Sequence, residues 1–467
     1  MKKILYFITI NLMISSLAVS CRDADLEPTL AQAKDLETSI NTTEDLSALL
    51  SATYDRMSQT AYYGRDIIIY GEVRSDNAYS NANSNRFVTV GQMKMVPADA
   101  YPTDTWTQIY RAIATANIII NKSESSIKGD LAEIRHIKGQ ALAIRALAHF
   151  DLVRLFGQQH VNGGGMSAMG VPYVTVFKDS NDLFPARNTV QEVYNLAKDD
   201  IANALQLMNP SLDDSSKHYM TSQAANAILA RMALYFDDMP TAEAAAAKVV
   251  NSGKYSVASA SSFASTFNTD STSNVIFSIS AAPNDNMGIN GLANIYRGAS
   301  YGDIVILKDL FDKYATGDVR GSTTFIQPRT TAAADFRNVG KYPTMGTFSD
   351  DIPVIRYEEM VLIYAEALLR NNKAGNALTE LNKIPANRGA AAYTAATLDN
   401  ILLERRKELA FEGFRFDDLA RTKKSLPLVD AVRQTYGNVT YGAFNYAFPI
   451  PGAEVGANSN IKQNSGY

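Results

Sequence analysis

Residues Asp130–Gly157, DLAEIRHIKGQALAIRALAHFDLVRLFG, carry the pattern that determines the architecture. Apolar side chains recur here every three or four residues, which is the spacing of one face of an α-helix: Ile134, Ile137, Ala141, Ile144, Ala148, Leu152 and Leu155. Four basic residues fall off that stripe: Arg135, Lys138, Arg145 and Arg154. Asp130 can cap the first turn and Gly157 can close the last. The sequence therefore predicts a long helix with one apolar face.

Further along the chain, two other segments have the pattern of paired helices. Ser222–Lys254 and Ile355–Ile384 each contain two amphipathic runs joined by a turn, and each is close to the tetratricopeptide period of about 34 residues. Small side chains stand where two helices must approach: Ala227, Ala230, Ala233, Ala246, Ala365, Ala367 and Ala377. Such a pair cannot bury its apolar face alone, so we expect the pairs to stack on neighbours. The prediction is a mainly α-helical body of tetratricopeptide-like pairs.

Between the pairs the chain changes character. Val257–Phe348 is rich in Ser, Thr, Asn and Gly, with a short strand predicted at Val275–Ile279 and a helix at Ile304–Tyr314. Tyr70–Pro102 and Asn284–Gly302 have the composition of loops. Long irregular segments on a helical scaffold commonly carry binding function. These loop-rich, short-strand insertions are therefore the expected place for a binding site.

The N-terminus has the pattern of a lipoprotein signal. Lys2 and Lys3 precede an uncharged apolar run that ends at Cys21, the only cysteine of the chain. The run is shorter than the roughly 20 apolar residues of a membrane-spanning helix, and small residues precede the thiol, as they do before a signal-peptidase cut. We therefore expect residues 1–20 to be a signal peptide and Cys21 to be the lipidated N-terminus of a tether over residues 21–40. Acidic residues at Asp23, Asp25 and Glu27 resemble a surface-export tag.

The composition of the chain limits the classes of partner that it is expected to bind. The formal net charge is −4 over 467 residues, and the sequence contains no polybasic patch, so nucleic acid is not an expected partner. There are 24 Tyr and 19 Phe but a single Trp, Trp106. Tyrosine combines an apolar ring with a polar tip, which suits a wet binding surface.

No convincing catalytic set is present in the sequence. The four histidines are scattered, no zinc-binding or phosphate-binding motif occurs, and the one cysteine is assigned to lipidation. The densest polar signature is Leu403–Arg421, LERRKELAFEGFRFDDLAR. Its spacing places Arg405, Glu408 and Glu412 on one face of a predicted helix that ends at Gly413. Two acids on one face need cations nearby. We interpret this cluster as a partly buried Arg–Glu clamp between helices rather than as a catalytic glutamate.

These segments together resemble the SusD/RagB family of outer-membrane nutrient-binding lipoproteins. The resemblance rests on six pieces that follow the family's order: TWTQIYRAIATANIIIN from Thr105, IKGQALAIRALAHFDLVRLFG from Ile137, ARNTVQEVYNLAKDDI from Ala186, RYEEMVLIYAEALL from Arg356, ERRKELAFEGFRFDDLAR from Glu404, and QNSGY from Gln463. Ser465 stands where the family usually has Pro, and Trp106 falls in a helix motif rather than in a loop.

The resemblance implies a SusD-like helical body without enzyme activity. No cofactor is expected, and no residues are assigned as metal ligands. It implies an N-terminal SusD-like helical domain over residues 41–254 and a C-terminal RagB/SusD domain over residues 255–467, packed into one globular body. Such proteins are similar to lids over a SusC-like TonB-dependent outer-membrane transporter, to which they deliver a captured ligand. The expected location is therefore the outer membrane, through the lipid anchor, facing the cell exterior.

The expected ligand is an oligosaccharide held by the irregular loops. Sugar rings lie against aromatic faces, and their hydroxyls need Asp, Asn and Arg partners. Seven residues of the two loops are the candidates for ligand contact: Asp76, Asn77, Tyr79, Arg86, Asn294, Tyr296 and Tyr301.

Three alternatives remain open at the level of sequence. A RagB-like lid of the same transporter type would bind peptides, and the single Trp favours it slightly. An extracellular hydrolase would need an acid pair or metal set that the sequence does not show. A helical scaffold lipoprotein would face the periplasm.

Overall fold

Stacked helices make up most of the described chain. The structure is a computed structural model that describes residues 39–328 and 335–467. Thr42–Tyr467 form one compact unit, while the predicted signal peptide and Cys21 lie outside the described residues. The expected division into domains at residue 254 stays a prediction.

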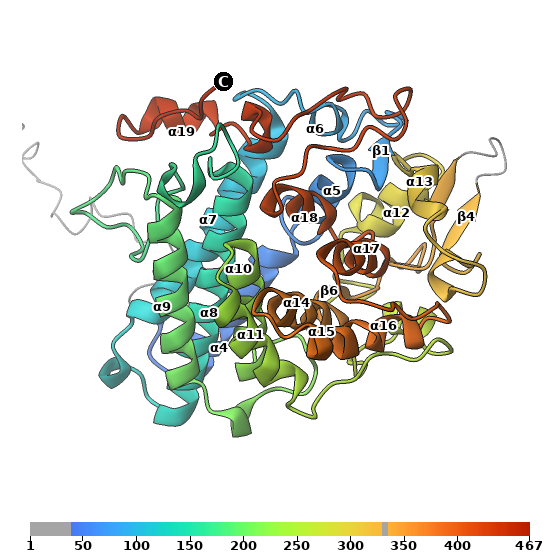
Figure 1. Ribbon diagram of the computed structural model, residues 1–467. Helices are drawn as coiled ribbons and strands as arrows, with labels where there is room; N and C mark the ends of the chain where they lie inside the picture. The colour runs from blue at the N-terminus through green and yellow to red at the C-terminus, as the bar shows by residue number, and fades with distance from the viewer. Residues whose placement is uncertain (1–38, 329–334) are drawn as a thin grey trace, which may run out of the picture. The chain divides into compact units, whose positions relative to one another are not determined.

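The first half of the unit is a row of long helices. These are α4 (Thr43–Ser58), α7 (Ala100–Asn121), α8 (Leu131–Phe156), α9 (Val190–Leu207), α10 (Ser222–Tyr235) and α11 (Met239–Val250). Helix α8 packs against α4, α7 and α9, and α10 packs against α9 and α11. Figure 1 shows α7, α8 and α9 running side by side.

Helix α8 confirms the long helix predicted at 130–157, with one correction. Asp130 caps it by accepting hydrogen bonds from the backbone of Ala132 and Glu133 at 2.8 and 3.0 Å. Almost all of its side chains are buried, including the charged Lys138 and Arg145, which the periodicity placed off the apolar stripe. Arg145 is compensated by Asp200 of α9 at 2.6 Å. A helix buried on most of its faces lies at the centre of a fold rather than at its surface.

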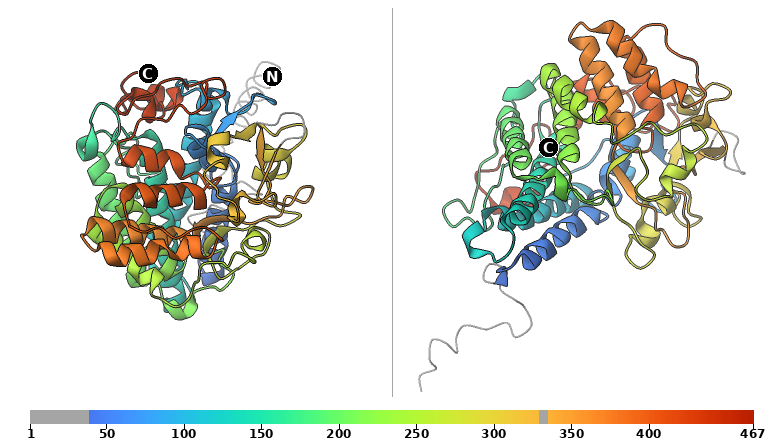
Figure 2. Two further views of the ribbon diagram at one scale, coloured as in Figure 1. Left: turned by 45° about the vertical axis from the view of Figure 1, so that its right-hand side comes forward. Right: turned by 90° about the horizontal axis from the view of Figure 1, so that it is seen from below.

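The second half continues the stack with α14 (Tyr357–Arg370), α15 (Ala374–Leu381), α16 (Lys383–Ala386), α17 (Leu398–Glu408) and α18 (Arg415–Arg421). Helix α14 packs on α11, so the two predicted pairs are neighbours, as the view from below also shows (Figure 2). All seven alanines predicted at close helix approaches are fully buried. The mainly α-helical, tetratricopeptide-like body is confirmed.

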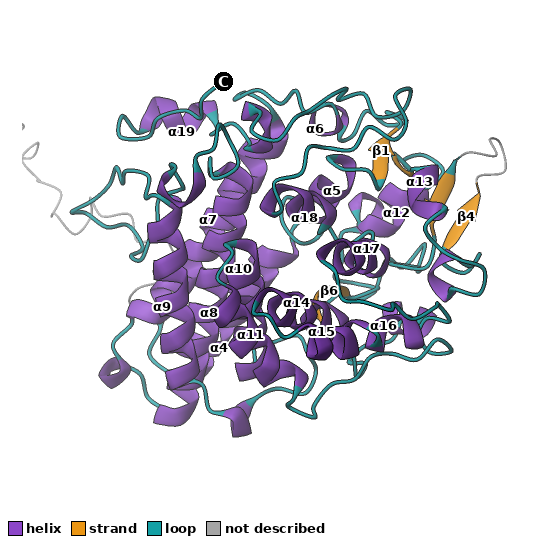
Figure 3. Ribbon diagram, viewed as in Figure 1, coloured by secondary structure: helices purple, strands orange, loops and turns teal. Residues whose placement is uncertain are grey.

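Most of the short strands lie at the right of Figure 3, whereas the short helix α19 lies at its upper left. The strands are β1 (Ala78–Ser80), β2 (Val275–Ile279), β3 (Ile304–Ile306), β4 (Ile326–Pro328), β5 (Phe336–Asn338) and β6 (Ile352–Arg356). They form an antiparallel sheet in the order β1-β3-β5-β4 and a β2-β6 pair. The short helices are α5 (Asp66–Val73), α6 (Val88–Gly91), α12 (Leu292–Arg297), α13 (Lys308–Phe311) and α19 (Gly452–Ala457). Single 3-10 turns occur at Glu124–Ser126, Gly165–Ser167, Pro210–Leu212, Ala264–Phe267, Gly288–Asn290, Val319–Gly321 and Phe444–Tyr446.

The insertions confirm one sequence prediction and correct three. The strand predicted at Val275–Ile279 is β2. The helix predicted at Ile304–Tyr314 is wrong, because Ile304–Ile306 is a buried strand and only Lys308–Phe311 is helical. β-Branched side chains favour that strand, which pairs with β1 in the register Ala78↔Ile306. The predicted loops at 70–102 and 284–302 contain helices α6 and α12, and the first also takes in the ends of α5 and α7.

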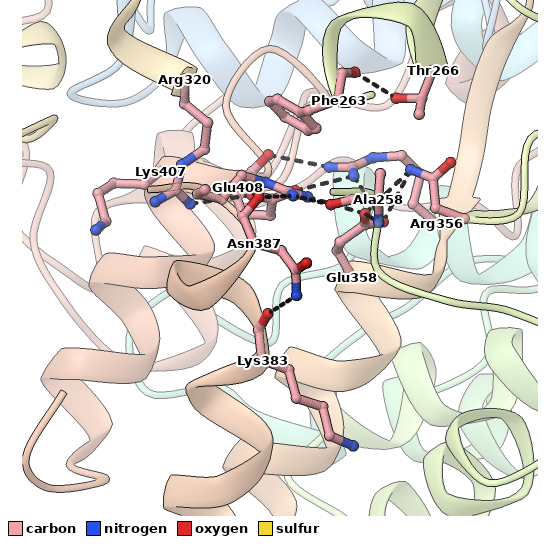
Figure 4. A network of polar contacts seen from close by, with 12 residues as sticks. Ala258, Phe263, Thr266, Arg320, Arg356, Glu358, Lys383, Asn387, Lys407 and Glu408 are labelled. Atoms are coloured by element: carbon pink, nitrogen blue, oxygen red, sulfur yellow. Dashed lines mark hydrogen bonds and ion pairs between the residues drawn. The ribbon is translucent and has the colours of Figure 1, made fainter. Parts of the chain in front are cut away.

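A buried network of ion pairs joins the insertions to the stack (Figure 4). Glu408 at the end of α17 contacts Arg388 at 2.9 Å, Arg320 at 3.1 Å and Arg356 at 3.2 Å, and its side chain is fully buried. Glu412 pairs with Arg356 at 2.7 Å and also with Lys341. Burial alone would raise the pKa of Glu408, but the charges of Arg388 and Arg356 outweigh it and hold that pKa well below its usual range.

The Arg–Glu clamp interpretation is therefore confirmed, although its partners differ from those expected. Helix α17 ends at Glu408, so Glu412 lies in the following turn and not on the same helical face. Arg405 pairs with Asp418 at 2.9 Å rather than with Glu408. The cations that compensate the two glutamates come from segments outside the motif, which its spacing alone cannot reveal.

Candidate functional site

The two predicted loops meet along the β1–β3 pairing. Strand β1 pairs antiparallel with β3, with Tyr79 opposite Val305. Buried Asp303, just before β3, accepts hydrogen bonds from the Ser84 backbone at 2.8 Å, the Ser84 hydroxyl at 2.5 Å and the Arg86 backbone at 3.3 Å. The Asn83 amide donates to the Tyr301 carbonyl at 2.6 Å. One buried carboxylate thus fixes the first loop against the second.

The backbone of the first loop is strained. Ala82, Asn85 and Phe87 have φ values of 58°, 65° and 58°, in the left-handed region that residues other than glycine seldom occupy. Phe87 is anchored by full burial and by stacking on Tyr101, with ring centroids 4.8 Å apart. Left-handed residues cluster at ligand sites when the surrounding structure holds them in place, as Asp303 and Phe87 do here.

The β1–β3 pairing brings two predicted ligand residues, Arg86 and Tyr301, together with Asn290 at the surface. The Arg86 guanidinium lies over the Tyr301 ring, 3.8 Å from its centroid, and donates to the Asn290 side chain at 3.3 Å. Arg86, Tyr301 and Asn290 are each half-buried. Together with Tyr79 they form what we call the loop surface. An arginine held on an aromatic face keeps its charge in a fixed position.

Tyr79 also lines a cleft of about 320 Å³ next to the loop surface. Its walls include Asn81, Gln92, Arg433 and Tyr436. The Tyr79 hydroxyl donates to Asp335 at 3.1 Å, and Arg433 lies 3.8 Å from the same carboxylate. Burial, and then the charge of Asp335, raises the pKa of Tyr79, so the phenol stays protonated and can donate.

Asp76 and Asn77 are not at this surface. Asp76 is 2 % exposed, and it pairs with Arg415 at 2.6 Å and with Arg406 at 3.3 Å. Burial alone would raise its pKa, but the Arg415 hydrogen bonds and the Arg406 charge lower it, so the carboxylate is ionised and paired. Asn77 is fully buried between Glu72 and Arg406. Both side chains join α5 to the C-terminal helices.

Asn294 and Tyr296 are also interior residues. The Asn294 amide donates to the Ile289 carbonyl at 2.6 Å, and the residue is 5 % exposed. Tyr296 is fully buried and is stacked parallel to Tyr342, with 6.3 Å between ring centroids. Of the seven predicted ligand residues, the structure therefore brings Tyr79, Arg86 and Tyr301 to the surface and buries the other four.

Sequence reasoning missed the residues that reach this surface from elsewhere. Arg433 and Tyr436 come from a C-terminal segment more than 300 residues away from Tyr79, Asp303 stands at a strand end, and Gln92 follows α6 inside the first predicted loop, where it was not singled out. No motif marks any of them, because their relevance comes from the tertiary fold. Only Asp303 had a local signal, as an acid directly before a run of β-branched residues.

The described residues show neither a metal centre nor a membrane span. Within residues 39–328 and 335–467, no three His, Cys, Asp or Glu side chains come together as metal ligands would. None of the helices in those ranges combines the length and the hydropathy of a bilayer-spanning segment.

Two family models match the chain. One, described as starch-binding and associating with the outer membrane, matches residues 25–234. The other, described as the SusD family, matches residues 307–467. The chain is also 26 % identical to the SusD-like protein P2 of Formosa agariphila over the whole length of both proteins.

Solved structures of the same superfamily are also similar to the chain. The chain is similar to a SusD superfamily protein of Bacteroides thetaiotaomicron, with a TM-score of 0.82 and 27 % identity, covering 91 % of this chain and 99 % of that one. It is similar to a SusD superfamily protein of Bacteroides vulgatus with the same TM-score and 25 % identity, covering 92 % and 100 %.

Proposed function

The chain belongs to the SusD family, and on that basis we propose that it captures oligosaccharides and delivers them, as a lid, to a SusC-like TonB-dependent transporter. The description of the matching N-terminal family model as starch-binding and associating with the outer membrane supports this ligand class and this location.

The loop surface is the observation that carries the proposal. A sugar ring presents C–H faces that lie against aromatic rings and hydroxyls that need donors and acceptors. Tyr301 and Tyr79 supply rings, while Arg86 and Asn290 supply fixed polar groups. The adjoining cleft adds Arg433 and Gln92. A concave region with a few convergent polar groups is the usual form of a small-ligand site.

We assign the loop surface to binding rather than to catalysis. The acidic pair in the densest polar motif, Glu408 and Glu412, is buried and neutralised by arginines, so neither carboxylate reaches a ligand at the surface. The two carboxylates beside the cleft are engaged, since Asp335 accepts from Tyr79 and Asp430 pairs with Arg433 at 2.8 Å.

Anchoring through Cys21 completes the proposal. One acyl chain holds a protein at a membrane only weakly, so we propose that this cysteine carries several chains, as bacterial lipoproteins do. The acids at Asp23, Asp25 and Glu27 support export to the outer face.

Isothermal titration against starch-, xylan- and laminarin-derived oligosaccharides tests the ligand class. A hydrogen bond from a charged group is worth about 1.5–3 kcal/mol. We therefore expect Arg86→Ala to weaken binding by about 10- to 100-fold and Tyr301→Ala to weaken it measurably. Arg135→Ala is the matched control, because Arg135 is exposed on α8, where it pairs with Glu124 at 3.1 Å.

Unchanged affinity in both loop variants would exclude the loop surface as the binding site. Binding of mixed tripeptides with no binding of any saccharide would instead support a peptide-binding lid, the alternative favoured by the buried position of Trp106, which is 4 % exposed.

A further inference from the structure

A second polar pocket lies where three segments far apart in sequence meet, and none of its lining residues belongs to the loop surface. Its volume is about 290 Å³, at the lower end of the range of small-molecule sites. Gln159 and His160 follow α8, Tyr235 ends α10, Phe236 and Asp237 lie in the turn before α11, and Lys423 and Tyr441 follow α18. This volume suits a ligand of one or two rings.

The walls of the pocket are fixed by backbone contacts. Val161 and Gly442 form a parallel bridge, with the Asn162 amide donating to the Gly442 carbonyl at 2.9 Å. The Tyr441 amide donates to the Ser425 hydroxyl at 3.0 Å. The segment after α8 and the C-terminal segment are therefore held together without help from a ligand.

A chain of hydrogen bonds runs from the interior to this pocket. The Gln159 amide nitrogen donates to the Tyr235 hydroxyl at 2.9 Å, and Tyr235 lies 3.1 Å from His160 Nε2. His160 Nδ1 lies 3.3 Å from the Tyr441 hydroxyl. Because the Gln159 amide nitrogen also contacts the Val153 carbonyl at 3.1 Å, its orientation as a donor is set.

With Gln159 as a donor, either tautomer of His160 leaves one tyrosine proton without an acceptor in the described part of the chain. Tyr235 is buried and Tyr441 is half-buried, so the less costly arrangement is the one in which Tyr235 donates to His160 Nε2. His160 then carries its proton on Nδ1 and donates to Tyr441. No group in the described part of the chain accepts the Tyr441 proton, so this hydroxyl is left as a donor for a ligand.

The His160 imidazole stays neutral near pH 7, and this arrangement of hydrogen bonds requires a neutral ring. Burial, and then repulsion by Lys423, lowers the pKa of His160 to about 4. Burial raises the pKa of Tyr441, which keeps its proton in place. The opposite tautomer would leave the Tyr235 proton without an acceptor.

We propose that this pocket is a second saccharide subsite that holds a single sugar residue, with Tyr441 donating to a ring hydroxyl and the rings of Tyr235, Phe236 and Tyr441 forming apolar walls. Asp237 lies at the rim, where one carboxylate oxygen pairs with Arg370 at 2.6 Å and the other can accept a hydroxyl proton, and Lys423 donates. The side-chain set favours a hydroxyl-rich ligand because hydroxyl, carboxylate and ammonium groups stand beside aromatic walls. The proposal rests on the proposed function only for the class of ligand.

Long-range ¹⁵N–¹H correlation spectra of the full-length protein labelled at histidine test this directly. The expected spectrum shows His160 protonated on Nδ1. Titration with maltose, cellobiose and xylobiose is expected to shift the His160 signals for at least one disaccharide. Tyr441→Phe keeps the ring and removes only the donor, so it should weaken that response about three- to tenfold.

The loop variant Arg86→Ala separates this inference from the proposed function. A His160 response that survives in Arg86→Ala supports an independent subsite, even if the loop surface proves not to bind. Two results of the saccharide titration would overturn the subsite: no disaccharide shifts the His160 signals at tens of millimolar, or Tyr441→Phe responds like the wild type. A proton on Nε2 would overturn the hydrogen-bond arrangement on which the subsite depends. Signals that shift with the tripeptide Ala-Ala-Ala and with no disaccharide would also overturn it.

Discussion

At the scale of single residues, the most consequential side chains are the buried charges around Glu408. Each glutamate there has at least two cationic partners, and Arg388 and Arg356 are themselves almost completely buried. Replacing a whole buried network with apolar groups is often harmless, whereas removing one member leaves an unpaired charge in the interior. The network therefore makes each of its members hard to replace alone.

Glu408→Gln is expected to lower the free energy of unfolding by about 3–5 kcal/mol, because three arginines lose their shared carboxylate. Urea unfolding followed by circular dichroism measures this. The matched control is Asp312→Asn, which breaks the exposed Lys308–Asp312 pair and should change stability by less than about 1 kcal/mol. A loss below about 1 kcal/mol in Glu408→Gln would contradict this role.

The same carboxylates set the response to acid. The arginine charges depress the folded-state pKa of Glu408 and Glu412 below 4.5, against the effect of burial. Their stabilising contribution is then complete above pH 4.5 and is lost as pH falls toward the folded-state values. We expect the wild type to lose stability below about pH 4.5 more steeply than Glu408→Gln does. Urea midpoints between about pH 3 and pH 7 give both slopes, and parallel slopes would refute the linkage.

The candidate site shows where residue patterns fail. Asp76 and Asn77 lie in a polar, loop-like stretch and have the composition of a ligand-binding segment. Their partners, Arg406 and Arg415, are more than 300 residues away, so nothing local distinguishes a buried structural carboxylate from an exposed binding one. Tyr79, Arg86 and Tyr301 reach the surface because Asp303 and the β1–β3 register place them there.

At the scale of elements, long helices could be predicted and short elements could not. Helix α8 and the two helix pairs follow from a 3.6-residue period sustained over several turns. Three-residue strands such as β3 are too short to show a period, and their identity depends on a partner strand. The end of α17 could not be predicted either, for a different reason. Phe411 and Gly413, with φ values of 71° and 87°, reverse the chain where the composition still favours helix.

One contact between elements depends on two glycines. A Cβ atom on Gly71 in α5 would lie 1.9 Å from the Gly413 carbonyl oxygen, so the two backbones touch without side chains between them. This approach lets buried Glu72 accept a hydrogen bond from the Gly413 amide at 2.8 Å. The α5 segment that leads into the first loop is therefore held directly against the turn after α17.

Gly71→Ala is expected to lower the free energy of unfolding by about 3 kcal/mol or more, since a backbone must shift to make room. Gly375→Ala is the control within another short helix, α15, where an added Cβ meets no atom; it should stabilise by about 0.5–1 kcal/mol. Thermal melts of the two variants measure the difference. Equal melting temperatures would disprove the close approach.

At the scale of the whole molecule, the helical stack is the support and the insertions carry the loop surface. The ion-pair network and the glycine contact join the insertions to the stack, so the loop surface sits on a rigid base. A receptor that delivers its ligand to a partner benefits from this arrangement, because the bound sugar moves together with the body.

The proposed lipid anchor at Cys21 is tested with the full-length chain in cells. Metabolic labelling of intact cells with a clickable fatty acid is expected to mark the wild type and to leave Cys21→Ser unmarked. Protease treatment of the same cells should cleave the wild type if it faces outward. An unlabelled wild type would contradict the anchor, and full protection from protease would contradict the outward orientation.

Saccharide binding at the loop surface is the property on which the proposed function depends. Hydrogen-exchange mass spectrometry with and without a saturating oligosaccharide, chosen by titration, reports on that surface without intermediate assumptions. We expect slowed exchange in peptides covering residues 79–86 and 298–303, and a loss of that protection in Arg86→Ala. Saturated binding that leaves both peptides exchanging at their free rates would rule the loop surface out.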